Sequence, residues 1–247
     1  MKTFIIYLTL LIMGSNPLSA SNQDPLNNIQ ERIYDAFVEC NIKNSLTPLT
    51  DVENDLKQTK LKSQQGLVEY WQAYLDYYKA IYFLKHSKKK EAEKTCDQAI
   101  ELLENLKNKS SEDYALLAMI QSFNIQFKGF KAMFISSKVN RNAKKAIALN
   151  PENLRAYYVY ASHDFYTPAR YGGGKKAEKL LLTAIDLPSQ QIENAYLPSW
   201  GKVETYELLV KHYIKVEKKN EAKKFLKQGL EEFPDSYILK ELATKLI

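Results

Sequence analysis

The stretch YELLVKHYIKVEKKNEAKKFLKQGLEEFP, residues 206–234, decides the fold class. Large apolar side chains recur at helical spacing in its first half, and small or apolar ones recur in its second half. The polar run VEKKNE separates the halves as a turn, and Pro234 cannot continue a helix. The pattern predicts two amphipathic helices packed side by side. The positions concerned are Tyr206, Leu209, Val210 and Tyr213, then Ala222, Leu226 and Gly229.

The same arrangement recurs three times upstream. One copy runs from Tyr157 to Pro188, and a partial copy ends at Pro151. An earlier copy follows the aromatic run EYWQAYLDYYKAIYF, residues 69–83. No stretch alternates as a strand would. We therefore predict an all-α fold, an α-solenoid of stacked antiparallel helix pairs. The small or apolar positions are Tyr160, Ala161, Ala177, Leu181 and Ala184, then Ala143 and Ala146, then Ala92, Cys96 and Ala99.

These residues resemble the tetratricopeptide repeat (TPR) family, whose pattern is Trp-x2-Leu-Gly-x2-Tyr, then Ala-x3-Phe, then Pro. Val210 and Asp164 depart from that pattern, where a small residue and a Tyr are expected. The resemblance implies a TPR-like superhelix and a scaffold or adaptor role. The predicted division is 1–20 signal peptide, 21–66 N-terminal helices, 67–236 about four TPR-like helix pairs, and 237–247 C-terminal capping helix.

The first twenty residues, MKTFIIYLTLLIMGSNPLSA, have the order of a secretory signal peptide. A lysine precedes a short apolar run, and small residues follow it up to Ala20. An uncleaved anchor is the alternative. The net charge is +6, which favours nucleic acid in a cytoplasmic protein. Behind a signal peptide it favours an acidic surface or no partner, so we predict an exported protein, periplasmic or secreted, without a nucleic-acid partner.

The stretch FYTPARYGGGKKA, residues 165–177, interrupts the helical pattern. Ala161 and Ala177 are sixteen residues apart, whereas Val210 and Ala222, the matching pair, are twelve apart. A loop is therefore enlarged inside a repeat, with Thr167 extended before proline and glycines free to take positive φ. Either the loop displays Arg170 and Tyr171 to a partner, or Tyr171 packs back onto the helices. The GGGKK run at a helix start also suits a phosphate or carboxylate group.

Catalytic and metal-binding patterns are missing from the sequence. The three histidines have no ligand spacing, no Gly-x-Ser-x-Gly turn occurs, and only Cys40 and Cys96 are cysteines. The two cysteines either form a disulfide or lie buried as free thiols. We predict a protein that is not an enzyme, with no catalytic residue, cofactor or metal.

A stack of helix pairs offers a concave groove lined by the first helix of each pair. We predict that this groove, with the enlarged loop, binds a protein or peptide in the cell envelope. The alternative ligand is an acidic envelope glycan, and an enzyme of unknown type is a remote alternative. The candidate binding residues are Arg155, Tyr158, Ser162, Phe165, Arg170, Tyr171, Glu207 and Lys211.

Overall fold

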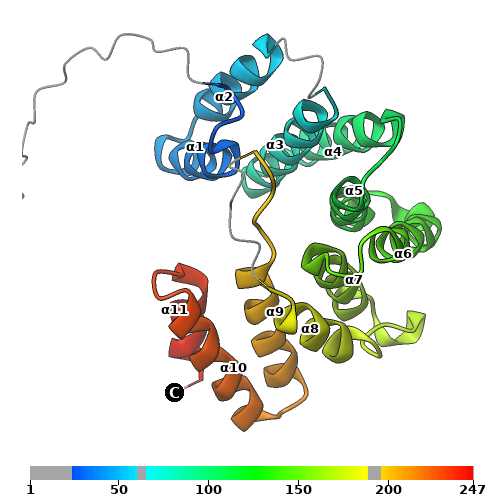
Figure 1. Ribbon diagram of the computed structural model, residues 1–247, viewed down its shortest axis with the longest axis vertical. Coiled ribbons are helices and arrows are strands. Elements are labelled where there is room, and N and C mark those ends of the chain that lie inside the picture. Colours follow the sequence, from blue (N-terminus) through cyan, green and yellow to red (C-terminus); the bar gives the residue numbers. More distant parts are fainter. Residues whose placement is uncertain (1–23, 60–64, 189–195, 247) are drawn as a thin grey trace, which may run out of the picture.

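The computed structural model describes residues 24–59, 65–188 and 196–246. Within these ranges the chain forms eleven α-helices and three short 3-10 helices, and no β-strand. Figure 1 shows successive helices lying side by side around a curved stack. The predicted all-α solenoid of stacked helix pairs is confirmed.

The helices form an N-terminal pair, four further pairs and a final single helix. The first pair is α1 (Ile29–Lys43) and α2 (Thr47–Gln58). The next pairs are α3 (Gln65–Lys85) with α4 (Lys89–Asn105), and α5 (Ser111–Asn124) with α6 (Ala132–Leu149). They are followed by α7 (Leu154–Tyr166) with α8 (Ala177–Asp186), α9 (Lys202–Lys215) with α10 (Lys219–Glu232), and α11 (Tyr237–Lys245). The short helices are η2 (Ile125–Phe127), η3 (Gly129–Lys131) and η4 (Ala169–Tyr171).

Small residues let the helices of a pair approach closely. In the last pair Ala222 and Gly229 of α10 are buried against α9. A Cβ added at Gly229 would lie 3.0 Å from Tyr206 Cγ and 3.0 Å from Leu239 Cδ1. Since such contacts are tighter than interiors normally allow, a larger residue there would push α10 away from α9 and α11.

Three features bear on the expectations about the compartment. Cys40 and Cys96 are both buried free thiols. In the ranges given above, no helix is long and apolar enough to cross a membrane. The predicted signal peptide, residues 1–20, lies outside the described residues.

The break between α7 and α8 is organised by Asp164. Its Oδ2 accepts hydrogen bonds from the backbone N–H groups of Lys176 (2.8 Å) and Ala177 (2.9 Å), at the first turn of α8. Its carbonyl oxygen accepts from Gly174 N (2.8 Å). A carboxylate also suits the positive end of a helix dipole. The residue that departs from the TPR pattern therefore joins the two helices across the enlarged loop.

The loop itself closes tightly behind this contact. Thr167 is extended before Pro168, and Gly172 and Gly174 have φ of 87° and 79°. A Cβ at Gly173 would lie 1.9 Å from the carbonyl oxygen of Thr167. Tyr171 is 66% exposed and does not pack back onto the helices. The glycines are thus needed for conformation and for space, and they turn Tyr171 outward.

Asp164→Ala should lower the free energy of unfolding by about 1–3 kcal/mol, because it leaves two N–H groups of α8 without their acceptor. Chemical denaturation monitored by circular dichroism measures this. Asp35→Ala is the control, because Asp35 is exposed on α1 and its loss should change stability by less than about 0.5 kcal/mol. Equal effects of the two substitutions would contradict the capping role.

Candidate functional site

A segment of the chain crosses the concave side of the stack. Residues 196–201 run from the neighbourhood of α1 and α3 to the start of α9 (Figure 1). We call residues Tyr196–Gly201, sequence YLPSWG, the crossing segment. Pro198 has no N–H and favours an extended backbone, so this part of the chain does not continue the helical pattern.

Gln30 of α1 holds the backbone of the crossing segment. Its Oε1 accepts from Ser199 N (2.8 Å) and from Trp200 N (3.1 Å). Its Nε2 donates to Ser199 Oγ (3.0 Å). The Oε1 atom of Gln30 therefore accepts from two consecutive backbone donors of the crossing segment, and these two bonds do not depend on the side chains of that segment.

Trp71 and Asp24 contact Tyr196, the first residue of the crossing segment. Trp71 Nε1 on α3 donates to the carbonyl oxygen of Tyr196 (2.8 Å). The Tyr196 hydroxyl donates to Asp24 Oδ2 (2.6 Å). Together with Gln30, these contacts hold both ends of the five-residue stretch Tyr196–Trp200 against the N-terminal part of the stack.

The Trp200 side chain occupies an aromatic socket. Its Nε1 donates to Tyr70 Oη (2.9 Å). Its ring stacks on Tyr74, with centroids 6.2 Å apart and planes at 23°. The edge of Tyr158 on α7 meets the same ring at 6.3 Å and 77°. The indole is thus buried with its only polar atom satisfied, as buried aromatic side chains require.

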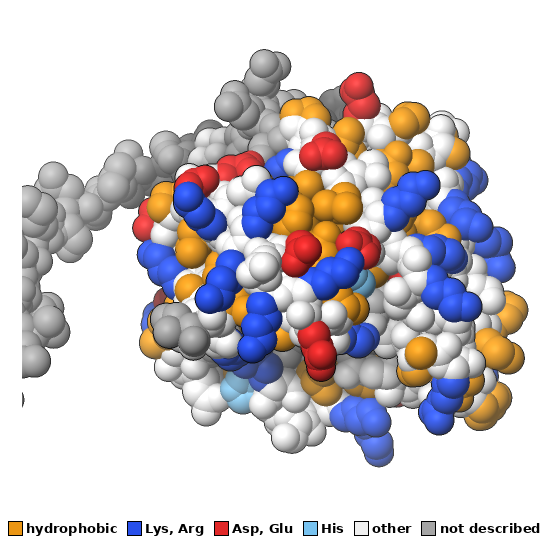
Figure 2. Space-filling view, turned by 90° about the horizontal axis from the view of Figure 1, so that it is seen from below, with side chains coloured by type: hydrophobic (Ala, Val, Ile, Leu, Met, Phe, Trp, Pro, Cys, Tyr) orange, Lys and Arg blue, Asp and Glu red, His pale blue; other side chains and the backbone are white. Residues whose placement is uncertain are grey.

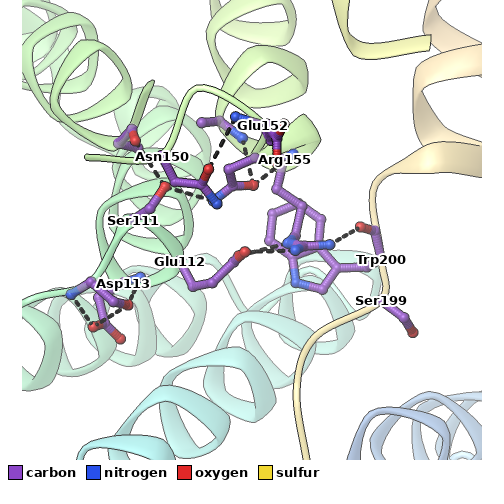
Figure 3. Close-up of polar contacts among 12 residues, drawn as sticks. Ser111, Glu112, Asp113, Asn150, Glu152, Arg155, Ser199 and Trp200 are labelled. Carbon is purple, nitrogen blue, oxygen red and sulfur yellow. Dashed lines mark hydrogen bonds and ion pairs between the residues drawn. The ribbon is translucent and has the colours of Figure 1, made fainter. Parts of the chain in front are cut away.

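Arg155 closes this socket from α7. Its guanidinium forms two hydrogen bonds of 2.6 Å with the Glu112 carboxylate on α5, and Nη1 donates to the carbonyl oxygen of Trp200 (3.1 Å), as Figure 3 shows. Its charged centre lies 5.8 Å from the Trp200 ring. Burial disfavours the charge, yet the contacts with Glu112 raise the pKa of Arg155 above its ordinary value. The cation is therefore a structural clamp between α5, α7 and the crossing segment.

Two neighbouring residues keep Arg155 in place. Asn153 caps α7, with Oδ1 accepting from Arg155 N (3.0 Å), and its Nδ2 donates to the buried Ser111 hydroxyl (2.8 Å). A Cβ at Gly201 would lie 2.9 Å from Arg155 Cγ. Glycine therefore follows Trp200 because the backbone passes directly against α7.

Next to the socket, Tyr158 of α7 lies near Glu204 and Glu207 of α9, and we call these three residues and Lys211 the α7–α9 cluster. Glu204 Oε2 accepts from Gly201 N (2.8 Å), and burial raises the pKa of the Glu204 carboxyl. Burial also raises the pKa of Tyr158, and the negative charge of Glu204 adds to this effect. Lys211 forms an ion pair with Glu207. The α7–α9 cluster thus places a tyrosine, a buried carboxyl and an ion pair next to the socket.

The structure brings some of the predicted binding residues together. Tyr158, Glu207 and Lys211 belong to the α7–α9 cluster. Ser162 is half-buried one turn after Tyr158. Phe165 is buried, with Lys215 Nζ 4.5 Å from its ring centroid.

The other three lie elsewhere. Arg155 was expected on an exposed stripe of the groove, but its side chain is 0% exposed because the crossing segment covers it. Arg170 and Tyr171 are exposed in the enlarged loop, at the outer side of α7 and α8 in Figure 1, with the guanidinium 4.9 Å from the tyrosine ring.

Sequence reasoning missed the residues that hold the crossing segment. These are Gln30, Tyr70, Trp71, Glu112 and Trp200. The available signal was the run LPSWG before α9, since it breaks the helical pattern without the polar composition of a surface turn. Both tryptophans of the chain belong to this contact.

No catalytic or metal-binding arrangement accompanies the site. Across the described residues, no three His, Cys, Asp or Glu side chains are grouped as metal ligands would be. The buried His163 lies between two hydroxyls, with Nδ1 3.1 Å from Ser122 Oγ and Nε2 2.8 Å from Ser136 Oγ. Burial lowers its pKa and so favours the neutral ring. The fold is therefore that of an all-α protein built from stacked helix pairs.

Comparison with known families gives one match. Residues 4–115, just under half of the chain, match the family described as "HTH-type transcriptional regulator Rgg, C-terminal domain". A search of curated proteins finds no match. The prediction that the chain is not an enzyme is confirmed, because the matched family consists of transcriptional regulators.

This match corrects four predictions. The resemblance to the TPR family is wrong, since the matching family is a different one. The envelope scaffold, with its alternative of binding an envelope glycan, is wrong because the family regulates transcription. The signal peptide and the periplasmic or secreted location are wrong for the same reason. The exclusion of nucleic acid is wrong because regulators of this type bind DNA.

The first twenty residues resembled a signal peptide because a short apolar run carries that pattern in any context.

Gln30→Ala should release the crossing segment locally without unfolding the stack. The Ser199 and Trp200 amides would lose their acceptor, so their hydrogen exchange should accelerate by about five- to tenfold. Exchange measured by NMR or mass spectrometry checks this. Gln228→Ala, on the exposed side of α10, is the matched control and should leave both amides unchanged. Unaltered exchange in Gln30→Ala would show that other contacts hold the segment.

Proposed function

We propose that the chain is a regulatory helical-repeat domain of a transcriptional regulator and that its concave face recognises an extended peptide. The match to the C-terminal domain of a helix-turn-helix type regulator supports the regulatory class. Stacked helix pairs with an inner concave face support peptide recognition, because such stacks present long surfaces to extended ligands. In this role, occupancy of the concave face would change the action of the regulator on DNA.

One observation carries the proposal: the concave face already holds a non-helical peptide, the crossing segment. Gln30 binds two of its N–H groups, and Trp71 and Arg155 each donate to one of its carbonyl oxygens. Side-chain contacts to a peptide backbone are a general means of binding an extended chain. The Trp200 socket adds an anchor of the kind that dominates peptide interfaces.

The α7–α9 cluster beside the socket extends the proposed peptide site. Tyr158, Ser162, Glu207 and Lys211 would contact residues that follow or precede the anchor. Tyrosines supply contact area at low conformational cost, and the ion pair of Lys211 with Glu207 offers charged groups of both signs to a ligand. For the chain after residue 20 we propose the division predicted from the sequence: N-terminal helices 21–66, helical repeats 67–236 and a capping helix 237–247.

The test uses a labelled peptide with the sequence YLPSWG and the variant Trp200→Ala. Because this substitution empties the socket, the peptide should bind the variant at least about tenfold more tightly than the wild-type protein, in which the socket is filled. Fluorescence anisotropy measures the affinities. A scrambled peptide of the same composition is the control and should bind neither protein.

Two further variants keep this test decisive. Adding Gln30→Ala to Trp200→Ala should abolish binding, because the two hydrogen bonds from peptide N–H groups to the Gln30 side chain are then lost. If Trp200→Ala does not fold, Trp200→Leu replaces it, since leucine keeps an apolar side chain at this position but is smaller than the indole and leaves part of the socket open. Equal affinity of the native and scrambled peptides for the opened variant would refute specific recognition.

The enlarged loop is tested separately. If Arg170 and Tyr171 also contact the partner, changing both to Ala should weaken peptide binding to the opened variant by about tenfold or more. Stability should change little, because both side chains are exposed. Thermal unfolding and affinity are measured on the same sample. A stable double variant with full affinity would remove this loop from the site.

A further inference from the structure

The outward side of α6 carries apolar and cationic side chains on one surface. Ser136, Val139, Ala143 and Ala146 turn inward, and the opposite side of the helix is exposed. Phe130 is 93%, Met133 76% and Phe134 65% exposed. We call this surface the α6 outer face. It consists of Phe130, Met133, Phe134, Ser137, Lys138, Arg141, Lys144 and Lys145.

The three large apolar side chains form one projecting group. Phe130 precedes Met133 and Phe134 by three and four residues, so all three lie on the same side of the first turn. Gly129, with φ of 49°, allows the turn of η3 that places Phe130 there. Large apolar side chains grouped in water indicate a surface that is covered in some state of the protein.

The charge around this group has one sign. From residue 114 to residue 151 the sequence contains no Asp or Glu, while it contains six Lys and Arg. Lys128 is neutralised by Glu93 and Asp97, and Lys138 lies 3.4 Å from Glu104. Arg141 and Lys144 are exposed and form no ion pair with a described residue. The cations follow the apolar group directly along the helix.

We propose that the α6 outer face binds an anionic lipid surface, with Phe130, Met133 and Phe134 inserted among the lipids and the cations of α6 against the headgroups. Interfacial helices combine these two features: apolar side chains that enter the acyl boundary and Lys or Arg that contact anionic lipid. A nucleic acid would satisfy the charge but would leave three apolar side chains against phosphate. An anionic lipid surface matches both the positive charge and the exposed apolar side chains.

The position of the α6 outer face agrees with this occupant. In Figure 1, α6 lies at the outer edge of the stack, away from the crossing segment. Figure 2 shows Lys and Arg side chains over much of the face seen from below and hydrophobic side chains projecting at its right-hand rim. A flat partner can therefore reach α6 without disturbing the concave face, so this inference is independent of the proposed function.

The test is flotation of the full chain with vesicles of phosphatidylcholine, with and without about one third phosphatidylglycerol. The protein should float with the anionic vesicles and stay in solution with the neutral ones. Phe130→Ser with Phe134→Ser should reduce binding at least tenfold, as should Arg141→Glu with Lys144→Glu, by removing apolar insertion and charge respectively.

Matched variants and a nucleic-acid arm complete the design. Lys223→Glu with Lys227→Glu makes the same charge change on α10, and Ile42→Ser with Tyr237→Ser removes equally exposed apolar side chains. Both controls should bind as the wild-type protein does. Equal loss in either control, or equal binding to neutral vesicles, would overturn the proposal. The proposal would also be overturned if the protein did not float with anionic vesicles but bound a labelled DNA duplex or single-stranded RNA, and if this binding depended on Arg141 and Lys144.

Discussion

The ion pair of Arg155 with Glu112 is the contact on which the concave face depends. A fully buried guanidinium must keep its partners, since removing one partner of such a pair costs about 3–5 kcal/mol. Two of its nitrogens face Glu112 on α5, and a third donates to the carbonyl of Trp200. Helices α5 and α7 and the crossing segment therefore cannot separate independently. The position of the Trp200 indole, and with it the shape of the face, follows from this constraint.

A groove that holds its own segment is pre-organised for a competing one. Gln30, Trp71 and Arg155 are already in the rotamers that bind an extended backbone, so an incoming peptide would not have to order them. It would have to displace the crossing segment, whose ends remain covalently attached at high effective concentration. A ligand would therefore need contacts with the α7–α9 cluster, in addition to the socket, in order to displace the segment. In the proposed function, the crossing segment would cover the face until a ligand with these additional contacts displaced it.

The sequence predicts the helix pairs well because their pattern is local. Tyr206, Ala222 and Gly229 show the large and small positions that any stack of helix pairs requires, whatever the family. For the same reason the pattern indicated the fold correctly and the family wrongly. Asp164 was seen only as a missing aromatic, although a short carboxylate is what α8 needs at its first turn. Arg155 could not be placed, because the segment that buries it lies 45 residues further along the chain.

The two faces of the stack are joined through His163. Its ring nitrogens contact Ser122 of α5 and Ser136 of α6, and its backbone belongs to α7, which also carries Arg155 and Tyr158. Burial lowers the pKa of His163 and so favours the neutral ring, which can donate from one nitrogen and accept at the other and so pair with both hydroxyls. A protonated ring would have two donors and would need both hydroxyls as acceptors. The neutral histidine therefore keeps α6 in register with α7, and the outer face of one helix is held at a fixed distance from the peptide-holding face of the other.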